Sequence, residues 1–303
     1  MTALSVTLEC PQCHARGLHE SSSGAVCPGC RAAFPTVRGV RQFVRAEAYA
    51  DTFGYQWTRF ARTQLDSANH TTRSREAFVE RTGWTPESLN GLEVLDAGCG
   101  MGRYAEIALS GGASVHAVDL SAAVYAAREN LQQYPKARFY QADIMNLPFA
   151  PGSFDRIFSI GVLHHTPSTR RAFERLVPLL REGGEIAIWV YSTQIGPPLG
   201  SRLFRPITTR LPRPLLLSLC RLAVPLYRVH RLPLVGRLSF PLLPTSLNPD
   251  PEWRWLDTFD WFSPTFQWLH TYAEVEGWFR AAGLDQVWRG PFPVSVRGRR
   301  ARA

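Results

Sequence analysis

The chain has 303 residues, 45% of them hydrophobic and 19% charged, a composition typical of a soluble globular protein with one large domain and a small one. Its formal net charge is +9 at pH 7, and Lys136 is the only lysine among its basic residues. Met1 to Glu9 has no basic start and no long apolar run. We therefore expect no secretory signal peptide and a cytoplasmic location.

Four of the six cysteines form two C-x-x-C pairs separated by thirteen residues: Cys10, Cys13, Cys27 and Cys30. Each pair suits a tight turn, so four thiolates can converge on one ion in a tetrahedral zinc site. Paired disulfides are the poorer interpretation in a cytosolic protein, and a redox C-x-x-C motif would need a strand–helix context. We expect structural Zn²⁺ in a zinc ribbon over residues 1–45.

The ribbon is too small to hold together without its metal. Leu18 to Val26 predicts a small β-hairpin, and Val37 to Val40 predicts a further short strand or turn. Cys99 and Cys220 have no cysteine nearby and are expected to be bystanders.

Residues 46–89 link the ribbon to the next domain. Tyr49 to Trp57 is rich in aromatic residues, and Ser74 to Thr82 has the apolar spacing of a helix. Core packing is one explanation for these aromatic side chains.

A glycine turn follows the apolar run Leu92 to Leu95, which predicts a buried strand, and precedes Tyr104 to Leu109, which predicts a helix. Three glycines alternate in the turn: Gly98, Gly100 and Gly102. Glycine allows unusual backbone angles and close approach of a ligand. The dinucleotide spacing is G-x-G-x-x-G; here the third glycine comes one residue early. Asp96 lies two residues before the turn, which suits a cationic ligand better than a pyrophosphate.

Further strands are predicted over 114–118, 137–141, 154–159 and 185–191. Asp119 follows the first of these, where an acid at the carboxyl edge of a doubly wound sheet can accept ribose hydroxyls. Leu176 to Arg181 is expected to close a helix capped by Gly183 and Gly184. His164 and His165 follow the strand over 154–159.

These motifs, over residues 90–191, resemble those of the class I S-adenosylmethionine (SAM) methyltransferases, in particular the type 11 methyltransferase domain. The resemblance implies an α/β, Rossmann-like doubly wound sheet of strand order 3-2-1-4-5-7-6. A dehydrogenase-like nucleotide-binding fold is the alternative. The chain adds a small N-terminal zinc ribbon and an insertion between strand five and the last helix.

The resemblance also implies SAM as the cofactor and a set of residues that bind it. Asp119 would hold the ribose and Asp96, indirectly, the amino-acid end, while Asp143 and Ile144 would hold the adenine. Tyr55 would belong to a lid together with Gln56 and Trp57. The expected cofactor-binding residues are Asp96, Gly98, Gly100, Gly102, Asp119, Leu120, Asp143, Ile144 and Tyr55.

Residues 271–303 predict the last helix of the sheet, from Thr271 with a capping-box spacing to Glu274, and two closing strands over 284–289 and 292–296. The part between, residues 192–270, is then an insertion, expected to be a substrate cap. Leu215 to Arg231 could form a basic amphipathic helix broken at Pro225.

The insertion has an unusual composition. Ile195 to Pro249 contains eight arginines, ten prolines and no acid. No apolar stretch in it approaches the roughly 20 residues needed to span a bilayer. A plain helical cap, a peripheral membrane or lipid contact, a grip on an anionic substrate, and nucleic-acid binding all remain open.

SAM carries its methyl group on a sulfonium, so transfer is an in-line displacement that needs alignment and, for a weak acid, a base. His165 is the first candidate base and His164 the second, because histidine titrates near neutrality; either could instead only shape the pocket. Methyltransferases of exocyclic base amines usually carry [N/D/S]-P-P-[aromatic] after strand four. Phe158 to Gly161 departs from that pattern.

The leading hypothesis is a SAM-dependent methyltransferase acting on a small-molecule or lipid-linked acceptor. A ribosomal RNA base methyltransferase with a zinc ribbon is the alternative; the net charge favours it, and the ribbon's lack of an evident base-stacking surface opposes it. A third hypothesis is a non-catalytic zinc-ribbon scaffold with a decayed methyltransferase domain, against which the intact Asp96, Asp119 and Asp143 argue.

Overall fold

The computed structural model describes residues 6–44, 48–194 and 199–302. The remaining residues of the predicted ribbon (1–5 and 45), linker (46–47) and insertion (195–198), and residue 303, lie outside the described part. The division of the chain into five segments stays a prediction.

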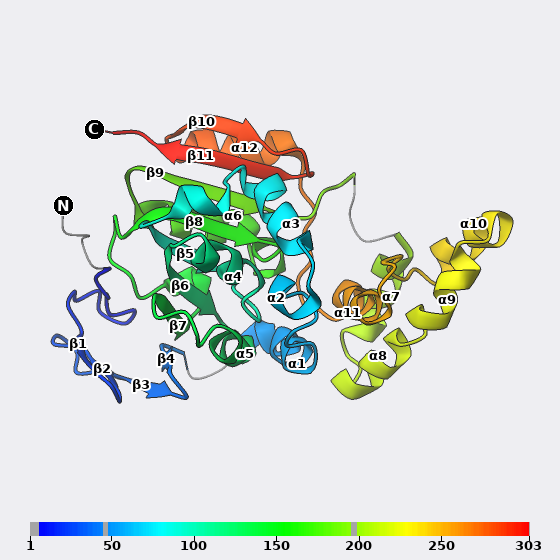
Figure 1. The fold of residues 1–303 in the computed structure, drawn as a ribbon, viewed down its shortest axis with the longest axis horizontal. Coiled ribbons are helices and arrows are strands. Elements are labelled where there is room, and N and C mark those ends of the chain that lie inside the picture. The colour runs from blue at the N-terminus through cyan, green and yellow to red at the C-terminus, as the bar shows by residue number, and fades with distance from the viewer. Residues whose placement is uncertain (1–5, 45–47, 195–198, 303) are drawn as a thin grey trace.

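A central parallel sheet dominates the molecule (Figure 1). Its strands are β5 (Glu93–Ala97), β6 (Ser114–Asp119), β7 (Ala137–Gln141), β8 (Phe154–Ile160) and β9 (Leu180–Trp189). Two strands that run antiparallel to their neighbours complete one edge: β10 (Leu284–Arg289) and β11 (Ser295–Arg300). The order β7-β6-β5-β8-β9-β11-β10 is the expected 3-2-1-4-5-7-6 arrangement. The predicted doubly wound fold is confirmed.

Helices cover both faces of this sheet, because its strands bury both sets of alternating side chains. They are α3 (Arg73–Thr82), α4 (Arg103–Ser110), α5 (Ala123–Asn130), α6 (Thr169–Leu176) and α12 (Tyr272–Ala281). Leu95 packs in one core cluster with Phe173 of α6 and Phe279 of α12. Its neighbour Val94 packs in the other cluster with Phe78 of α3. Side chains that alternate along β5 therefore face two separate cores.

The helix cap expected at the glycine pair is wrong. Gly183 and Gly184 lie inside β9 and do not cap a helix; α6 already ends at Leu176, and a 3₁₀ turn, Val177–Leu179, follows. Proline in that turn cannot continue the helix. The glycines lie at an irregular register with β8, where a Cβ on Gly184 would lie 2.9–3.2 Å from three carbonyl oxygens, as expected of a bulge.

The last strand also begins later than predicted. β11 starts at Ser295 instead of residue 292, and Ser295 pairs with Trp189 of β9. The predicted strand contained Pro293, which has no N–H to donate to a sheet.

The N-terminal ribbon extends the same sheet to eleven strands among the described residues. Its strands are β1 (His19–Ser21), β2 (Gly24–Val26), β3 (Ala33–Val37) and β4 (Val40–Gln42). The hairpin predicted over 18–26 is confirmed as β1 and β2. β4 pairs in parallel with β7, with Arg41 opposite Tyr140, and a bridge joins Leu8 to Phe149. The ribbon is therefore continuous with the edge of the main sheet.

The linker forms short helices before the first sheet strand of the core. They are a 3₁₀ turn (Ala48–Ala50), α1 (Asp51–Arg59), α2 (Asp66–Asn69), α3 and a second 3₁₀ turn (Pro86–Leu89). The carboxylate of Asp66 accepts from the backbone N–H groups of Ser74 and Arg75 and so caps the free N–H groups at the start of α3. The helix predicted over 74–82 is confirmed.

The insertion is helical and extends to the right of the sheet in Figure 1. Its helices are α7 (Leu199–Thr208), α8 (Arg213–Cys220), α9 (Ala223–His230), α10 (Pro233–Leu242) and α11 (Pro251–Phe262). The predicted break at Pro225 lies instead at Arg221 and Leu222. Pro225 lies in the first turn of α9, where its missing N–H has no helical partner to lose. None of the helices in the described ranges is long and apolar enough to cross a membrane.

Candidate functional site

A cavity of about 460 Å³ opens at the carboxyl ends of the parallel strands. This is the crevice where doubly wound sheets bind ligands. Its walls come from the segments that follow β5 to β9, together with α1 and α11. Of the predicted site residues it brings together Gly98, Gly100, Asp119, Leu120, Ile144 and His165. The others do not line it: Asp96, Gly102, Asp143, Tyr55 and His164.

The glycine turn needs its glycines for conformation and space. Gly98, Gly100 and Gly102 have φ values of +95°, +52° and +95°, a region that side chains disfavour. A Cβ on Gly98 would lie 2.3 Å from the side chain of Val162. A Cβ on Gly100 would approach the indole of Trp57. The turn therefore lets the loop after β8 and helix α1 close around it.

Asp119 joins the end of β6 to the glycine turn. Its Oδ2 accepts from the Gly100 N–H at 2.9 Å, and its Oδ1 accepts from the N–H and the hydroxyl of Ser121 at 2.9 and 2.7 Å. Burial raises the pKa of Asp119, and the hydrogen bonds from Ser121 and Gly100 oppose that rise. The result is a fixed acceptor on the cavity wall.

Asp96 lies beneath the turn, buried and outside the cavity wall. Its Oδ2 has no hydrogen-bond partner within the described structure. Burial, and next the charge of Asp119, raise its pKa well above the usual range. This position suits the indirect role predicted for it.

Apolar residues line the cavity beyond Asp119. Leu120 and Ile144 are both buried there. Asp143 stands just behind, and its Oδ1 accepts from the Tyr49 hydroxyl at 3.0 Å and from the Met145 N–H at 2.9 Å. Tyr49 itself lines the cavity, so it comes between Asp143 and the space inside.

Helix α1 presents Phe53, Gln56 and Trp57 to the cavity. Gln56 is buried, and its Oε1 has no partner among the described residues. Tyr55 packs instead toward the insertion, with its ring centroid 6.3 Å from that of Phe259. Gln56 and Trp57, which the resemblance also assigned to a lid, line the cavity, whereas Tyr55 does not; the lid role stays a prediction.

His165 is held in one tautomer. Its Nδ1 lies 2.8 Å from the carbonyl oxygen of Phe266, which can only accept, so Nδ1 carries the proton. In the neutral ring Nε2 is then a free acceptor. Burial lowers the pKa of His165, partly offset by the charge of Asp260. A buried, neutral imidazole with a free nitrogen at a cavity wall can accept a proton.

His164 has a different environment. It is completely buried and stacks on Tyr191 with ring centroids 3.8 Å apart. Its Nδ1 accepts from the Tyr191 N–H at 3.3 Å, so the proton of the neutral ring sits on Nε2. Burial and the adjacent His165 lower its pKa well below the usual range. This geometry favours a packing role for His164.

Sequence reasoning missed the carboxylates on the far wall of the cavity. Asp257 and Asp260 of α11 both line the cavity, and Asp260 accepts from the Tyr191 hydroxyl at 2.7 Å. Burial and the charge of Asp260 raise the pKa of Asp257 to about 7. Tryptophans complete the wall: Trp189, Trp253 and Trp261. Two acids three residues apart in an aromatic helix were the available signal.

Two arginines add positive charge to the cavity wall, Arg81 and Arg103. Arg103 donates to Ser74 Oγ at 2.9 Å and to Gln64 Oε1 at 3.3 Å. Arg81 lies over the Phe292 ring, 4.0 Å from its centroid, and burial lowers its pKa. Carboxylates and guanidinium groups therefore share one aromatic cavity.

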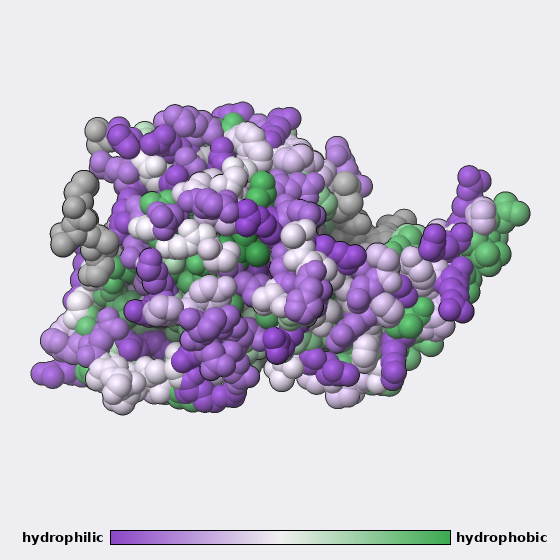
Figure 2. All heavy atoms as spheres, in the orientation of Figure 1, coloured by the Kyte–Doolittle hydropathy of each residue, from purple (hydrophilic) through white to green (hydrophobic). Residues whose placement is uncertain are grey.

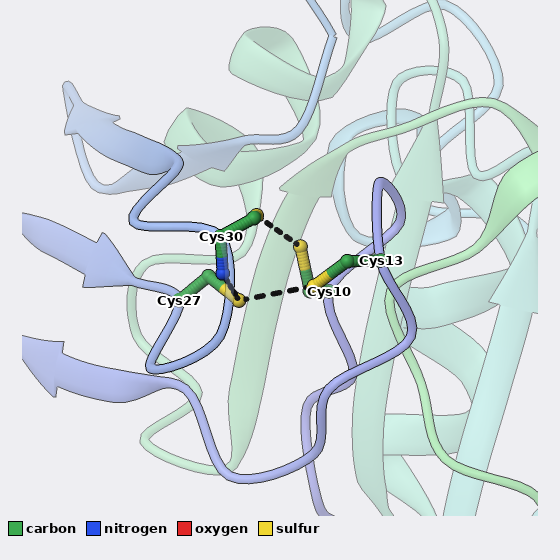
Figure 3. Close-up of side chains that lie close together, drawn as sticks. All are labelled: Cys10, Cys13, Cys27 and Cys30. Carbon is green, nitrogen blue, oxygen red and sulfur yellow. Dashed lines mark hydrogen bonds between the residues drawn. The ribbon is translucent and has the colours of Figure 1, made fainter.

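The four ribbon cysteines form a separate cluster (Figure 3). Their side chains point toward one another from two loops, and the four Sγ atoms lie within 4.8 Å of one another. The Sγ atoms of Cys10 and Cys30 are 3.7 Å apart and those of Cys13 and Cys27 3.5 Å apart. A disulfide needs about 2.05 Å, so these cysteines are not bonded to one another.

The two loops repeat the same backbone turn. The Cys10 N–H donates to the Ala15 carbonyl and the Cys27 N–H to the Ala32 carbonyl, both at 2.9 Å. The residue four positions after each of these cysteines donates back to the cysteine carbonyl. Such matched turns aim both thiol pairs at one point.

The comparisons with known proteins agree with this geometry. The family model described as "Methyltransferase domain" matches residues 95–188. This segment is similar to methyltransferase domains. Its sheet order and glycine turn are those expected of the class I, SAM-dependent type.

Similar proteins differ in what they methylate. Sterol 24-C-methyltransferase ERG6B of Gibberella zeae is 34% identical over 106 residues, 33% of this chain and 27% of that protein. Malonyl-[acyl-carrier protein] O-methyltransferase of Pectobacterium atrosepticum is 40% identical over 99 residues, 32% of this chain and 38% of that protein. The chain thus spans well under half the length of these curated relatives.

Solved structures resemble the methyltransferase domain only distantly. Phosphoethanolamine N-methyltransferase 2 of Haemonchus contortus, in complex with S-adenosyl-L-methionine, is 19% identical with a TM-score of 0.48 over 84% of this chain and 47% of that one.

The glycine turn yields a stability prediction. Gly98→Ala should lower the free energy of unfolding by about 1–3 kcal/mol more than Gly91→Ala. Both substitutions place alanine at a positive φ, but only the Cβ at position 98 would also be forced against Val162. Gly91 is the matched control: its φ is +74°, and a Cβ there meets nothing within 4 Å. Urea unfolding of both variants measures the difference. Equal losses would contradict the contact between the turn and Val162.

Proposed function

We propose that this protein is a SAM-dependent methyltransferase that acts on a small-molecule or lipid-linked acceptor. The observation that carries the proposal is that the glycine turn, Asp119 and His165 line one cavity at the carboxyl ends of the strands. The first two suit the cofactor, and the third suits a proton acceptor near the transferred group.

The residues present fit SAM. The Asp119 carboxylate can accept from ribose hydroxyls, and Leu120 and Ile144 offer apolar contact to an adenine. The unpartnered Gln56 Oε1 and the buried carboxylate of Asp96 favour a cationic group near the glycine turn. When bound, SAM supplies a methyl group on a sulfonium.

We assign the acceptor side to His165, Tyr191 and Asp260. His165 accepts the acceptor's proton at Nε2, while its Nδ1–H bond to the Phe266 carbonyl fixes the ring. The Tyr191–Asp260 pair faces the same cavity and orients polar groups there. The tryptophans exclude water and contact apolar parts of the acceptor.

The acceptor class follows from these walls. A cavity of about 460 Å³ with four tryptophans suits a small or elongated apolar molecule with a polar end. The relatives that methylate a sterol and an acyl-carrier-linked malonyl group are consistent with such acceptors. A ribosomal RNA base and a non-catalytic scaffold remain alternatives; the first has the +9 net charge in its favour.

We also propose one structural zinc ion in the ribbon. Four thiolates at about 2.3 Å around a tetrahedral ion lie roughly 3.8 Å apart. The Sγ distances of 3.5 and 3.7 Å within the cluster fit that size. Four protein ligands leave no open position, so the ion would serve folding and not catalysis.

Cofactor binding is tested at Asp119. Asp119→Ala should weaken SAM binding by about 2–3 kcal/mol, because it removes a charged acceptor of two hydrogen bonds. Isothermal calorimetry with SAM and S-adenosylhomocysteine measures the loss. The control Asp285→Ala removes the same charge from an exposed surface position and should bind normally. Unchanged affinity of Asp119→Ala would contradict the cofactor assignment.

Catalysis is tested at His165. His165→Asn keeps an N–H that can reach the Phe266 carbonyl but removes the free ring nitrogen, so turnover should fall by roughly 10²-fold. SAM affinity should stay nearly unchanged. Turnover is measured as methyl transfer to fractionated lipid and metabolite pools. Normal turnover of the variant would mean that alignment alone drives transfer.

The pH profile gives an independent check on His165. Burial lowers its pKa below 6.5, and the neutral form is the base. Turnover should therefore fall on acidification, with the limb that belongs to His165 centred below the usual pKa of histidine. The His165→Asn variant should lose that acidic limb; a midpoint above 6.5 in the wild type would contradict the assignment.

Metal binding is tested at Cys13. Cys13→Ser should lose most of the bound zinc and unfold the ribbon, because one thiolate of the tetrahedral set is gone. Cys220→Ser is the control, since Cys220 lies outside the cluster. Elemental analysis measures the ion. A ribbon that keeps its fold after chelation would contradict a structural role.

A further inference from the structure

The insertion carries a row of exposed leucines. Leu234, Leu238 and Leu242 of α10 are 78%, 73% and 69% exposed. They are spaced four residues apart and so share one face of the helix. In Figure 2 hydrophobic residues lie at the tip of the molecule where Figure 1 places α10. A helix face of this kind usually packs against another surface.

Helix α7 adds a second apolar row beside α10. Leu203 and Ile207 are 71% and 65% exposed and are also four residues apart. The two helices touch closely: a Cβ on Gly200 would lie 2.2 Å from the Pro241 carbonyl oxygen. We call α7 to α10 the arm. Most of the large, exposed apolar side chains among the described residues belong to it or to the segments that join it to α11.

The charge of the arm has one sign. Residues 199–249 contain eight arginines and no aspartate or glutamate. Five of the arginines whose side chains the structure describes are exposed: Arg210, Arg221, Arg228, Arg231 and Arg237. Within the described structure Arg228 and Arg237 have no polar partner. Arg213, by contrast, pairs with Asp51 of α1 and holds the arm to the core.

We infer that the arm docks on an anionic lipid surface. Exposed leucines enter the headgroup boundary, while arginines on the same helices meet lipid phosphates. The prolines keep the helices short, and no described helix is able to span a bilayer. A face that only met water would carry both signs of charge, and a dry protein interface would contain fewer arginines without partners.

Docking would bring the cavity close to the lipid. Helix α11 contacts α7, α8 and α9 of the arm. The same helix forms the cavity wall through Trp253, Asp257 and Asp260. Helix α11 therefore connects the arm to the acceptor side of the cavity. The docking itself does not depend on methyl transfer.

Vesicle flotation of the full chain tests the inference. The probes are phosphatidylcholine vesicles with and without phosphatidylglycerol, at low and high salt. We expect binding to the anionic vesicles only and release at high salt, because salt screens the arginines. Equal binding to both vesicle types, or to neither, would overturn the inference.

Two triple variants separate the contributions of the exposed leucines and of the arginines to vesicle binding. The first replaces the leucines (Leu234→Ser, Leu238→Ser, Leu242→Ser), and the second replaces arginines (Arg228→Gln, Arg231→Gln, Arg237→Gln). Removing three arginines should lower partitioning about 100-fold, at about 1 kcal/mol each. The matched control removes three exposed arginines from α6 (Arg170→Gln, Arg171→Gln, Arg175→Gln) and should bind vesicles nearly as the wild type does.

Calorimetry with SAM keeps the result independent of folding and of the proposed activity. Each variant should bind SAM normally. If the leucine variant does not bind SAM, the flotation of the arginine variant decides whether the arm docks on anionic lipid. Wild-type protein that fails to bind SAM but still floats with anionic vesicles would contradict the proposed function and support the docking. Leucine substitutions that dissolve a dimer in ultracentrifugation without affecting flotation would assign this face to a second copy. Tighter, salt-sensitive binding to ribosomal RNA than to vesicles would assign it to nucleic acid.

Discussion

The hydrogen bond from the Gly100 N–H to Asp119 is the constraint on which the rest of the site depends. It ties the ends of two neighbouring parallel strands together and fixes the turn between β5 and α4. The positive φ of Gly98 lets Val162, after β8, approach that turn. Three strand ends are thereby held around one cavity, and the acceptor oxygens of Asp119 are placed before any ligand arrives.

The cavity is formed by the sheet and the insertion together. The sheet supplies the turn, Asp119 and His165, and α11 supplies the opposite wall with Asp257 and Asp260. Tyr191, just after β9, connects the two through its hydrogen bond to Asp260. The cofactor side of the cavity is thus built from local strand-end motifs, whereas the acceptor side combines strand ends with a helix about seventy residues further along the chain.

Short-range spacing predicted the glycine turn and the position of Asp119, and the resemblance to the class I methyltransferases predicted the sheet order. It misplaced contacts that depend on helical phase or tertiary packing. Tyr55 differs from Gln56 by about 100° around α1, and that rotation directs it away from the cavity. The pairing of β4 with β7 left no local pattern, and the acids of α11 left only their spacing of three residues in an aromatic helix, since each contact depends on segments distant in the chain.

The central claim is that one cavity holds SAM between Asp119 and His165. A crystal structure of the full chain with S-adenosylhomocysteine tests it most directly. The account predicts the ribose hydroxyls on the Asp119 carboxylate, the adenine against Leu120 and Ile144, and the sulfur facing the His165 Nε2. A ligand bound elsewhere, or in the same cavity with its sulfur turned away from His165, would contradict it.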